Sequence, residues 1–168
     1  MDTMDVGLES GFDTATLRSV FGTFPTGVVA VAAHVDGVPT GFAASSFVSV
    51  SLDPPLVSFC VQNTSATWTL LKNCRSLGIS VLGETHEAVA RALAGRAENR
   101  FTDLTVSSGH GGPIFVDGAS AWLEVSIEEL IPAGDHTIAL MRVDGVASHD
   151  QEPIVFHRST FRSLKGSS

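Results

Sequence analysis

The first apolar pattern along the chain has the period of a helix. Four apolar side chains recur at positions i, i+3, i+4 and i+7 and share one face: Leu17, Val20, Phe21 and Phe24. Asp13 or Thr14 can cap the start of this helix, and Pro25 ends the pattern. The apolar face predicts a helix that docks on another surface. The polar residues 1–12 contain nothing to anchor them, so we expect a flexible tail there.

From residue 27 onward the pattern becomes that of strands, with two short helices inserted over residues 68–73 and 85–94. Asp36-Gly37 is a strong hairpin turn signal, and a second turn is expected over 132–135. Strand-like segments cover residues 27–34 with an extended continuation over 39–46, then 47–51, 56–62, 77–82, 121–128, 137–147 and 153–157. About seven strands joined by short turns favour a mainly antiparallel barrel.

Composition fits one globular domain over residues 13–165. The 168 residues include 10 Lys and Arg against 18 Asp and Glu, a formal net charge of −8. Charged residues make up only 17% and hydrophobic residues 43%, which argues against disorder and suggests more covered surface than a monomer of this size supplies. The acidic balance disfavours nucleic acid and anionic membranes, because both repel a protein of the same sign.

The sequence shows no secretory signal and no apolar run long enough to span a membrane, so we expect a cytoplasmic protein. Cys60 and Cys74 have no C-x-x-C spacing and are predicted to be two buried thiols. The six histidines are scattered without metal-ligand spacing, so no metal site is expected. The glycine-rich segment 109–112 does not lie between a strand and a helix, which indicates a loop rather than a dinucleotide cradle.

A hydroxyl-rich segment is the first candidate binding element. Ser45, Ser46, Ser49 and Ser51 precede Asp53-Pro54-Pro55, and hydroxyls beside strand-end N–H groups can hold a phosphate. On spacing alone, a polar strand face followed by a turn is the simpler interpretation.

Three further groups have two possible interpretations each. The turn hydroxyls and amide of Asn63, Ser65 and Thr67 either cap a helix or contact a ligand. Arg100 and Phe101 either pair a phosphate and cover a ring, or are a surface arginine and a core phenylalanine. His136 follows Gly134-Asp135 and is either a turn histidine or part of a site.

Taken together, these segments resemble the flavin reductase-like domain family in order and spacing. The resemblance covers about Phe21 to Leu164 and is closest to the small NAD(P)H:flavin oxidoreductases of two-component monooxygenases. It implies an antiparallel, Greek-key-like split β-barrel of the FMN-binding type, with two or three short helices and a homodimer that binds FMN or FAD near its interface. The segments that carry it are 24–28, 44–47, 49–56, 63–67, Arg100-Phe101 and 134–138.

The resemblance also implies roles for individual residues. His136 would lie where the nicotinamide cofactor approaches, and no residue is expected to act as an acid or base, because hydride transfer requires placement of two rings. The flavin would be bound by Thr26, Ser45, Ser46, Ser49, Val50, Ser51, Asn63, Ser65, Thr67, Arg100 and Phe101.

The expected function is an NAD(P)H-dependent flavin reductase, with NADH favoured, that supplies reduced FMN or FAD to a separate oxygenase or halogenase. The chain contains no tyrosine, whereas members of the family it resembles often have one near the C-terminus after a His-Arg pair. Here His157-Arg158 leads to Phe161. Three alternatives stay open: a barrel that holds flavin permanently as a sensor or electron carrier, a reductase of a corrinoid or ferric complex, and a structural interaction domain.

Overall fold

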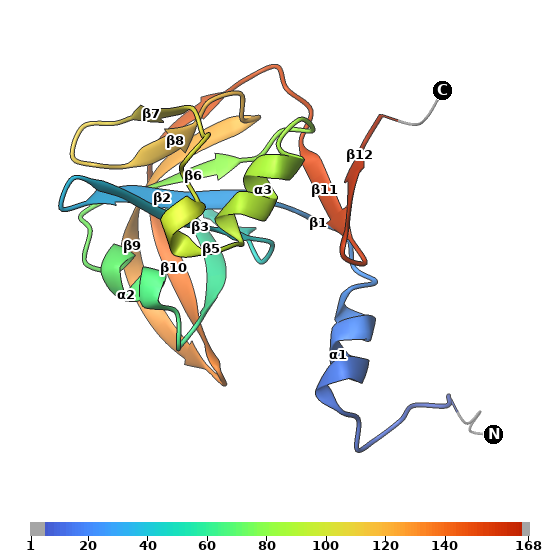
Figure 1. Cartoon of the computed structure of the whole chain (residues 1–168). Helices are drawn as coiled ribbons and strands as arrows, with labels where there is room; N and C mark the ends of the chain where they lie inside the picture. The colour runs from blue at the N-terminus through green and yellow to red at the C-terminus, as the bar shows by residue number, and fades with distance from the viewer. Residues whose placement is uncertain (1–5, 166–168) are drawn as a thin grey trace.

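The structure is a computed structural model that describes residues 6–165 (Figure 1). The part of the predicted tail over residues 1–5 lies outside the described residues, and residues 6–12 form neither helix nor strand. The helices are α1 (Thr14–Phe21), α2 (Ala66–Leu71), α3 (Glu87–Leu93) and the 3-10 turn η1 (Ala97–Asn99). The strands are β1 (Thr26–Gly27), β2 (Val29–Val35), β3 (Val38–Ala44), β4 (Val48–Leu52), β5 (Pro55–Gln62), β6 (Leu77–Val81), β7 (Val106–Ser108), β8 (Ile114–Val116), β9 (Ala121–Ala133), β10 (His136–Ser148), β11 (Ile154–His157) and β12 (Thr160–Ser163).

A seven-stranded antiparallel sheet forms the body of the molecule, in the order β3-β2-β6-β9-β10-β5-β4 (Figure 1). It curls so that β3, at one edge, comes into contact with β5, next to the other edge. The main core fills the inside of this curl, with Phe59, Ile79, Val125 and Met141 fully buried. A mainly antiparallel β fold is therefore confirmed, and the opening between its two edges is where a ligand can enter.

Turn chemistry sets the register of the two long hairpins. Asp36 and Gly37 both have positive φ, at 49° and 78°, which is the conformation of a two-residue turn that matches the twist of a hairpin. The predicted turn there is confirmed. At the β9–β10 hairpin only Gly134 and Asp135 turn the chain, because the two residues before them remain in the strand. The predicted turn over 132–135 was therefore too long.

An arm made of α1, β1, β11 and β12 extends from the body, with α1 standing clear of it (Figure 1). Asp13 caps α1 by accepting from the Thr16 N–H at 2.8 Å, as predicted. No residue of α1 is buried, and the Phe21 and Phe24 side chains are 69% and 74% exposed. The apolar face of this helix therefore finds no docking surface among residues 6–165.

Several sequence predictions need correction. Residues 6–165 contain twelve strands rather than about seven, in large part because β1, β7, β8 and β12 consist of only two to four residues each. Such runs are too short for an alternating pattern to be recognised. Cys60 and Cys74 are free thiols as expected, but both are only half-buried.

Candidate functional site

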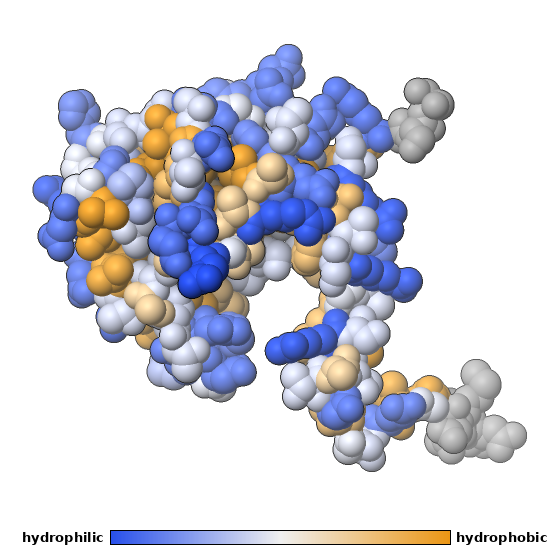
Figure 2. All heavy atoms as spheres, viewed as in Figure 1, coloured by the Kyte–Doolittle hydropathy of each residue, from blue (hydrophilic) through white to orange (hydrophobic). Residues whose placement is uncertain are grey.

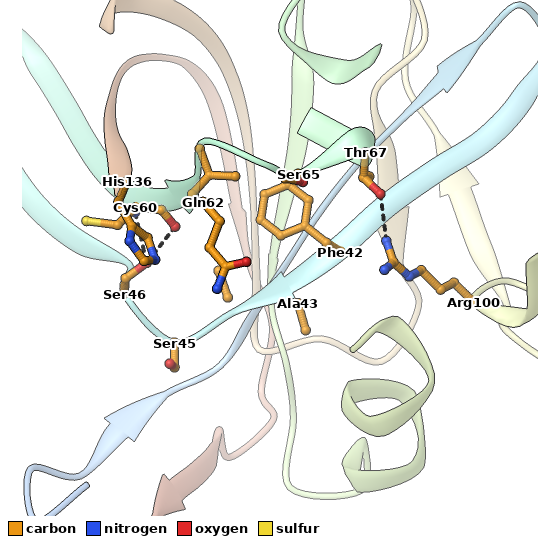
Figure 3. A pocket seen from close by; sticks show the side chains of 12 residues that line it. Phe42, Ala43, Ser45, Ser46, Cys60, Gln62, Ser65, Thr67, Arg100 and His136 are labelled. Carbon is orange, nitrogen blue, oxygen red and sulfur yellow. Dashed lines mark hydrogen bonds between the residues drawn. The ribbon is translucent and has the colours of Figure 1, made fainter. Parts of the chain in front are cut away.

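A cavity of about 440 Å³ opens at the split between the two sheet edges (Figure 3). Its walls come from the end of β3, the end of β5, the start of α2, the start of β10, and Arg100 in the loop after η1. The lining residues are Phe42, Ala43, Ala44, Ser45, Ser46, Cys60, Val61, Gln62, Ser65, Thr67, Arg100 and His136. His136 lies at one end of this set and Arg100 at the other (Figure 3).

One wall of the cavity is the unpaired edge of β3. In the β2–β3 hairpin, Val35 and Val38 close the turn, so the backbone groups of Pro39, Gly41 and Ala43 face away from β2. Pro39 fits this position because it has no N–H to leave unpaired. The N–H and C=O of Ala43 are therefore available to a ligand in the cavity.

The cavity hydroxyls are held in place by backbone contacts. Ser46 Oγ accepts from the Cys60 N–H at 2.9 Å and donates to the Cys60 carbonyl at 3.2 Å, which ties the segment after β3 to β5. Ser65 Oγ accepts from the Trp68 N–H at 3.1 Å and caps α2. The capping interpretation of Ser65 is correct, and its hydroxyl also lines the cavity.

Arg100 is a fixed cation at one end of the cavity. Its Nε donates to the Gly95 carbonyl at 3.0 Å, and one terminal nitrogen donates to the Gly41 carbonyl and to Thr67 Oγ1, each at 2.9 Å. Its other terminal nitrogen makes no hydrogen bond within residues 6–165, and no carboxylate of that part lies within ion-pair distance. A guanidinium that is held by neutral acceptors keeps its charge and one free edge for an anion.

His136 lies at the opposite end, at the first position of β10. Its Nδ1 is 2.7 Å from the Asp135 carboxylate. This contact lowers the pKa of Asp135 below its ordinary value, through the hydrogen bond first and the charge interaction second. With Nδ1 engaged by Asp135, Nε2 is the ring nitrogen available to another partner.

The structure brings together five of the predicted flavin-binding residues with His136 on the cavity wall: Ser45, Ser46, Ser65, Thr67 and Arg100. It places six others elsewhere. Thr26 is in β1 with a buried hydroxyl that has no hydrogen-bond partner within the described residues. Ser49, Val50 and Ser51 lie on the edge strand β4, around a bulge. Asn63 bonds to the Gly134 carbonyl and Thr137 hydroxyl, and Phe101 packs on the smaller core cluster beside α3.

Sequence reasoning missed several lining residues, including Phe42 and Gln62. Phe42 is half-buried and meets the Phe59 ring edge-on at a centroid distance of 6.0 Å. Its position beside the hydroxyl-rich segment was a usable signal, whereas Gln62 carried none, since exposed glutamines are common at strand ends.

Two negative findings concern residues 6–165 alone. No three His, Cys, Asp or Glu side chains there gather closely enough to hold a metal ion. None of the helices there combines the length and the apolar character needed to cross a membrane.

Residues 21–165 match the family model described as "Flavin reductase like domain". The chain belongs to this family. The match covers the body, the strands of the arm and the whole cavity wall, so the family resemblance expected from the sequence is confirmed.

Named relatives of this flavin reductase-like chain come from several bacteria. A Rhizobium meliloti protein named "Probable flavin reductase" is 43% identical over 79% of this chain, which spans only 43% of that protein. An NADH:FMN oxidoreductase of Rhodococcus qingshengii is 37% identical over 92% of this chain and 83% of its own length. The reductase subunit of a flavin-dependent monooxygenase of Rhodococcus jostii is 30% identical over 91% of this chain and 79% of its own length.

Solved structures agree in fold. An NADH:FAD oxidoreductase of Streptomyces globisporus, in complex with NAD and FAD fragments, has a TM-score of 0.88 and 36% identity over 94% of this chain and 96% of its own. The flavin reductase component of a bacterial two-component tryptophan halogenase has a TM-score of 0.83 and 34% identity over 92% of this chain and 100% of its own. The split-barrel architecture is thus shared with an enzyme named as an NADH:FAD oxidoreductase and with the flavin reductase component of a halogenase.

Proposed function

We propose that this chain is an NADH-preferring flavin reductase that transfers a hydride to FMN or FAD and releases the reduced flavin to a separate oxygenase or halogenase component. The observation that carries the proposal is the open cavity at the barrel split, which combines an unpaired strand edge, hydroxyls, and one unpaired cation at its end. The relatives named as reductase components of a monooxygenase and of a halogenase support the partner class.

The residues that line the first cavity fit the phosphate of a flavin at the Arg100 end and the flavin ring system along the β3 edge. The free edge of Arg100, together with the Thr67 and Ser65 hydroxyls, would bind the phosphate. The Ala43 backbone would offer a donor and an acceptor to the polar rim of the ring, and Phe42 an apolar surface. A bound flavin supplies a hydride acceptor, so the protein needs no acid or base for this step.

His136 would orient the nicotinamide at the other end of the cavity through Nε2, because Asp135 holds Nδ1. Arg100 is the one arginine on the cavity wall and is directed at the flavin end. A second guanidinium that could pair the 2′-phosphate of NADPH is not present on that wall. This arrangement supports NADH as the donor.

We further propose that the active form is a homodimer in which the arm of each chain packs on its partner. Val20 and Phe21 of α1, and Phe24 just after it, are exposed in the single chain, and an open gap separates α1 from the body (Figure 2). A second copy of this chain would cover that apolar face and bring its own arm toward the first body. Light scattering should give a dimer mass for the unmodified protein and a monomer mass for Phe21→Ser with Phe24→Ser. A monomeric unmodified protein would contradict this part.

The function is tested by following NADH and NADPH oxidation with FMN, FAD or no flavin added. Turnover of NADH that depends on added flavin is expected. A yellow protein without turnover would indicate a module that holds flavin permanently, and a colourless protein without turnover would contradict flavin binding at this cavity.

A further inference from the structure

Beyond Arg100 lies a second cavity, of about 310 Å³, on the outer side of β3. It shares Thr67 and Arg100 with the first cavity, so the two spaces meet at the same guanidinium. Its volume is within the roughly 300–1,000 Å³ typical of small-molecule sites. Whatever occupies it would be joined to the first cavity through the proposed phosphate position.

The walls of this second cavity are mostly apolar. Pro39 comes from the unpaired edge of β3, Leu70 from α2, and Ala97 from η1. Leu70 is 49% exposed, and Figure 2 shows hydrophobic atoms between the β2–β3 turn and α2. Exposed apolar side chains around a concavity are typical of a ligand site. Thus the space suits a flat apolar group more than a charged one.

Hydrogen-bonding groups are also present on one wall. The Pro39 carbonyl faces away from β2 and pairs with no other strand. An exocyclic amino group could donate to it. The carboxylate in this cavity, Glu98, is paired with Arg96 at 3.1 Å, which offsets its repulsion of a nearby phosphate. A planar ring with an amino substituent matches this combination.

We infer that the second cavity binds the adenine of FAD, and that this chain therefore prefers FAD to FMN. The inference rests on the proposed function, because it places the FMN half of FAD in the first cavity with its phosphate at Arg100. Arg100 would then bind the diphosphate, and Pro39 and Leu70 would contact the adenine. The family alone does not decide this, since its members include an NADH:FMN and an NADH:FAD oxidoreductase.

Two other spaces beside the first cavity suit the adenine less well. A small cavity beside α3 also touches Arg100, but Asp103 lines it and has no ion-pair partner within the described residues, so it would repel the diphosphate. Another, of about 140 Å³, adjoins the first cavity at Ser45 and shares neither Thr67 nor Arg100. Among these cavities of the described residues, the one outside β3 shares both Thr67 and Arg100 with the first cavity, and the carboxylate on its wall is paired.

Calorimetric titration with oxidised FAD and FMN, without nicotinamide, tests the inference. We expect the full chain to bind FAD at least about tenfold more tightly than FMN, a difference of about 1.4 kcal/mol. Ala97→Phe, which fills the second cavity, should remove the FAD advantage and leave the FMN Kd unchanged. Leu70→Ser, which removes an apolar wall without adding bulk, should reduce the same ratio. The matched control Ala88→Phe adds an identical ring on α3 and should keep the ratio.

Four other outcomes would overturn either the adenine site or the proposed function. Equal binding of both flavins would overturn the adenine site, and so would loss of the FAD advantage in Ala88→Phe but not in Ala97→Phe. In either case, FMN-dependent NADH oxidation would still support the proposed function. A higher KM for NADH in Ala97→Phe with an unchanged flavin ratio would assign the cavity to the adenine of NADH and also overturn the inference. Failure of both flavins to bind would contradict the proposed function itself.

Discussion

Replacing Arg100 by methionine should separate phosphate recognition from ring recognition. Methionine keeps much of the apolar stem and removes all five N–H donors. The free terminal nitrogen of Arg100 is the group available to the flavin phosphate. A hydrogen bond to a charged group contributes about 1.5–3 kcal/mol net, so the Kd for FMN should rise about 10- to 150-fold. Riboflavin has no phosphate and should bind the variant almost as it binds the original protein.

The same substitution also has a cost in stability, which the design must allow for. Arg100 donates to two backbone carbonyls, of the buried Gly41 and the exposed Gly95, and to the hydroxyl of the half-buried Thr67. At about 1 kcal/mol for each contact, the loss is about 3 kcal/mol in the free energy of unfolding. Binding should therefore be measured well below the unfolding temperature of the variant. Arg100→Lys keeps a charge but cannot reach all the acceptors at once, so an intermediate FMN Kd is expected.

The assay is a pair of titrations, FMN and riboflavin, into each protein. An equal loss for both ligands would show that Arg100 only holds Gly41 and Thr67 in position, and an unchanged FMN Kd would place the phosphate elsewhere. Either result would refute the assignment of the cavity end to a phosphate.

Three further predictions concern other parts of the chain. His136→Ala should raise the KM for NADH more than it lowers kcat, and a collapse of kcat at saturating NADH would contradict a purely orienting role. Burial lowers the pKa of His86, whose Nδ1 accepts from the Gly83 N–H at 2.9 Å, so protonation opposes folding. Neutral His86 therefore stabilises the fold fully above its ordinary pKa of 6.5, and this contribution is lost as the pH falls below that value. The free energy of unfolding in urea should depend less on pH in His86→Gln than in the exposed control His110→Gln. Gly41→Ala would place a Cβ 2.7 Å from a β2 carbonyl oxygen and should destabilise the fold by about 1–3 kcal/mol, whereas Gly27→Ala meets no atom within 4 Å and should change little in thermal unfolding.

The periodicity of apolar residues was sufficient to predict the long helices and strands but not the short strands. The hairpin at Asp36-Gly37 and the helix capped by Asp13 follow from local chemistry that a sequence displays directly. The strands β7, β8 and β12 pair with segments close by in the chain, but each has only three or four residues, so no alternating pattern marks them. The apolar face of α1 was correctly recognised, but the predicted docking is not seen within residues 6–165, where no residue of α1 is buried.

The candidate site depends on a property that residue identities do not display, namely the direction of backbone groups at an unpaired edge. Counting from the turn at Asp36-Gly37, the backbone N–H and C=O groups of every second residue of β3 point away from β2. The Gly41 carbonyl is one of these groups, and it accepts a hydrogen bond from Arg100, 59 positions away. For the same reason, the backbone groups of Ala43 are unpaired beside the first cavity and those of Pro39 beside the second. A one-residue slip in the β2–β3 register would therefore turn all three away together. Because the hairpin turn fixes that register, it also determines which backbone groups face the two cavities, although neither turn residue lines them.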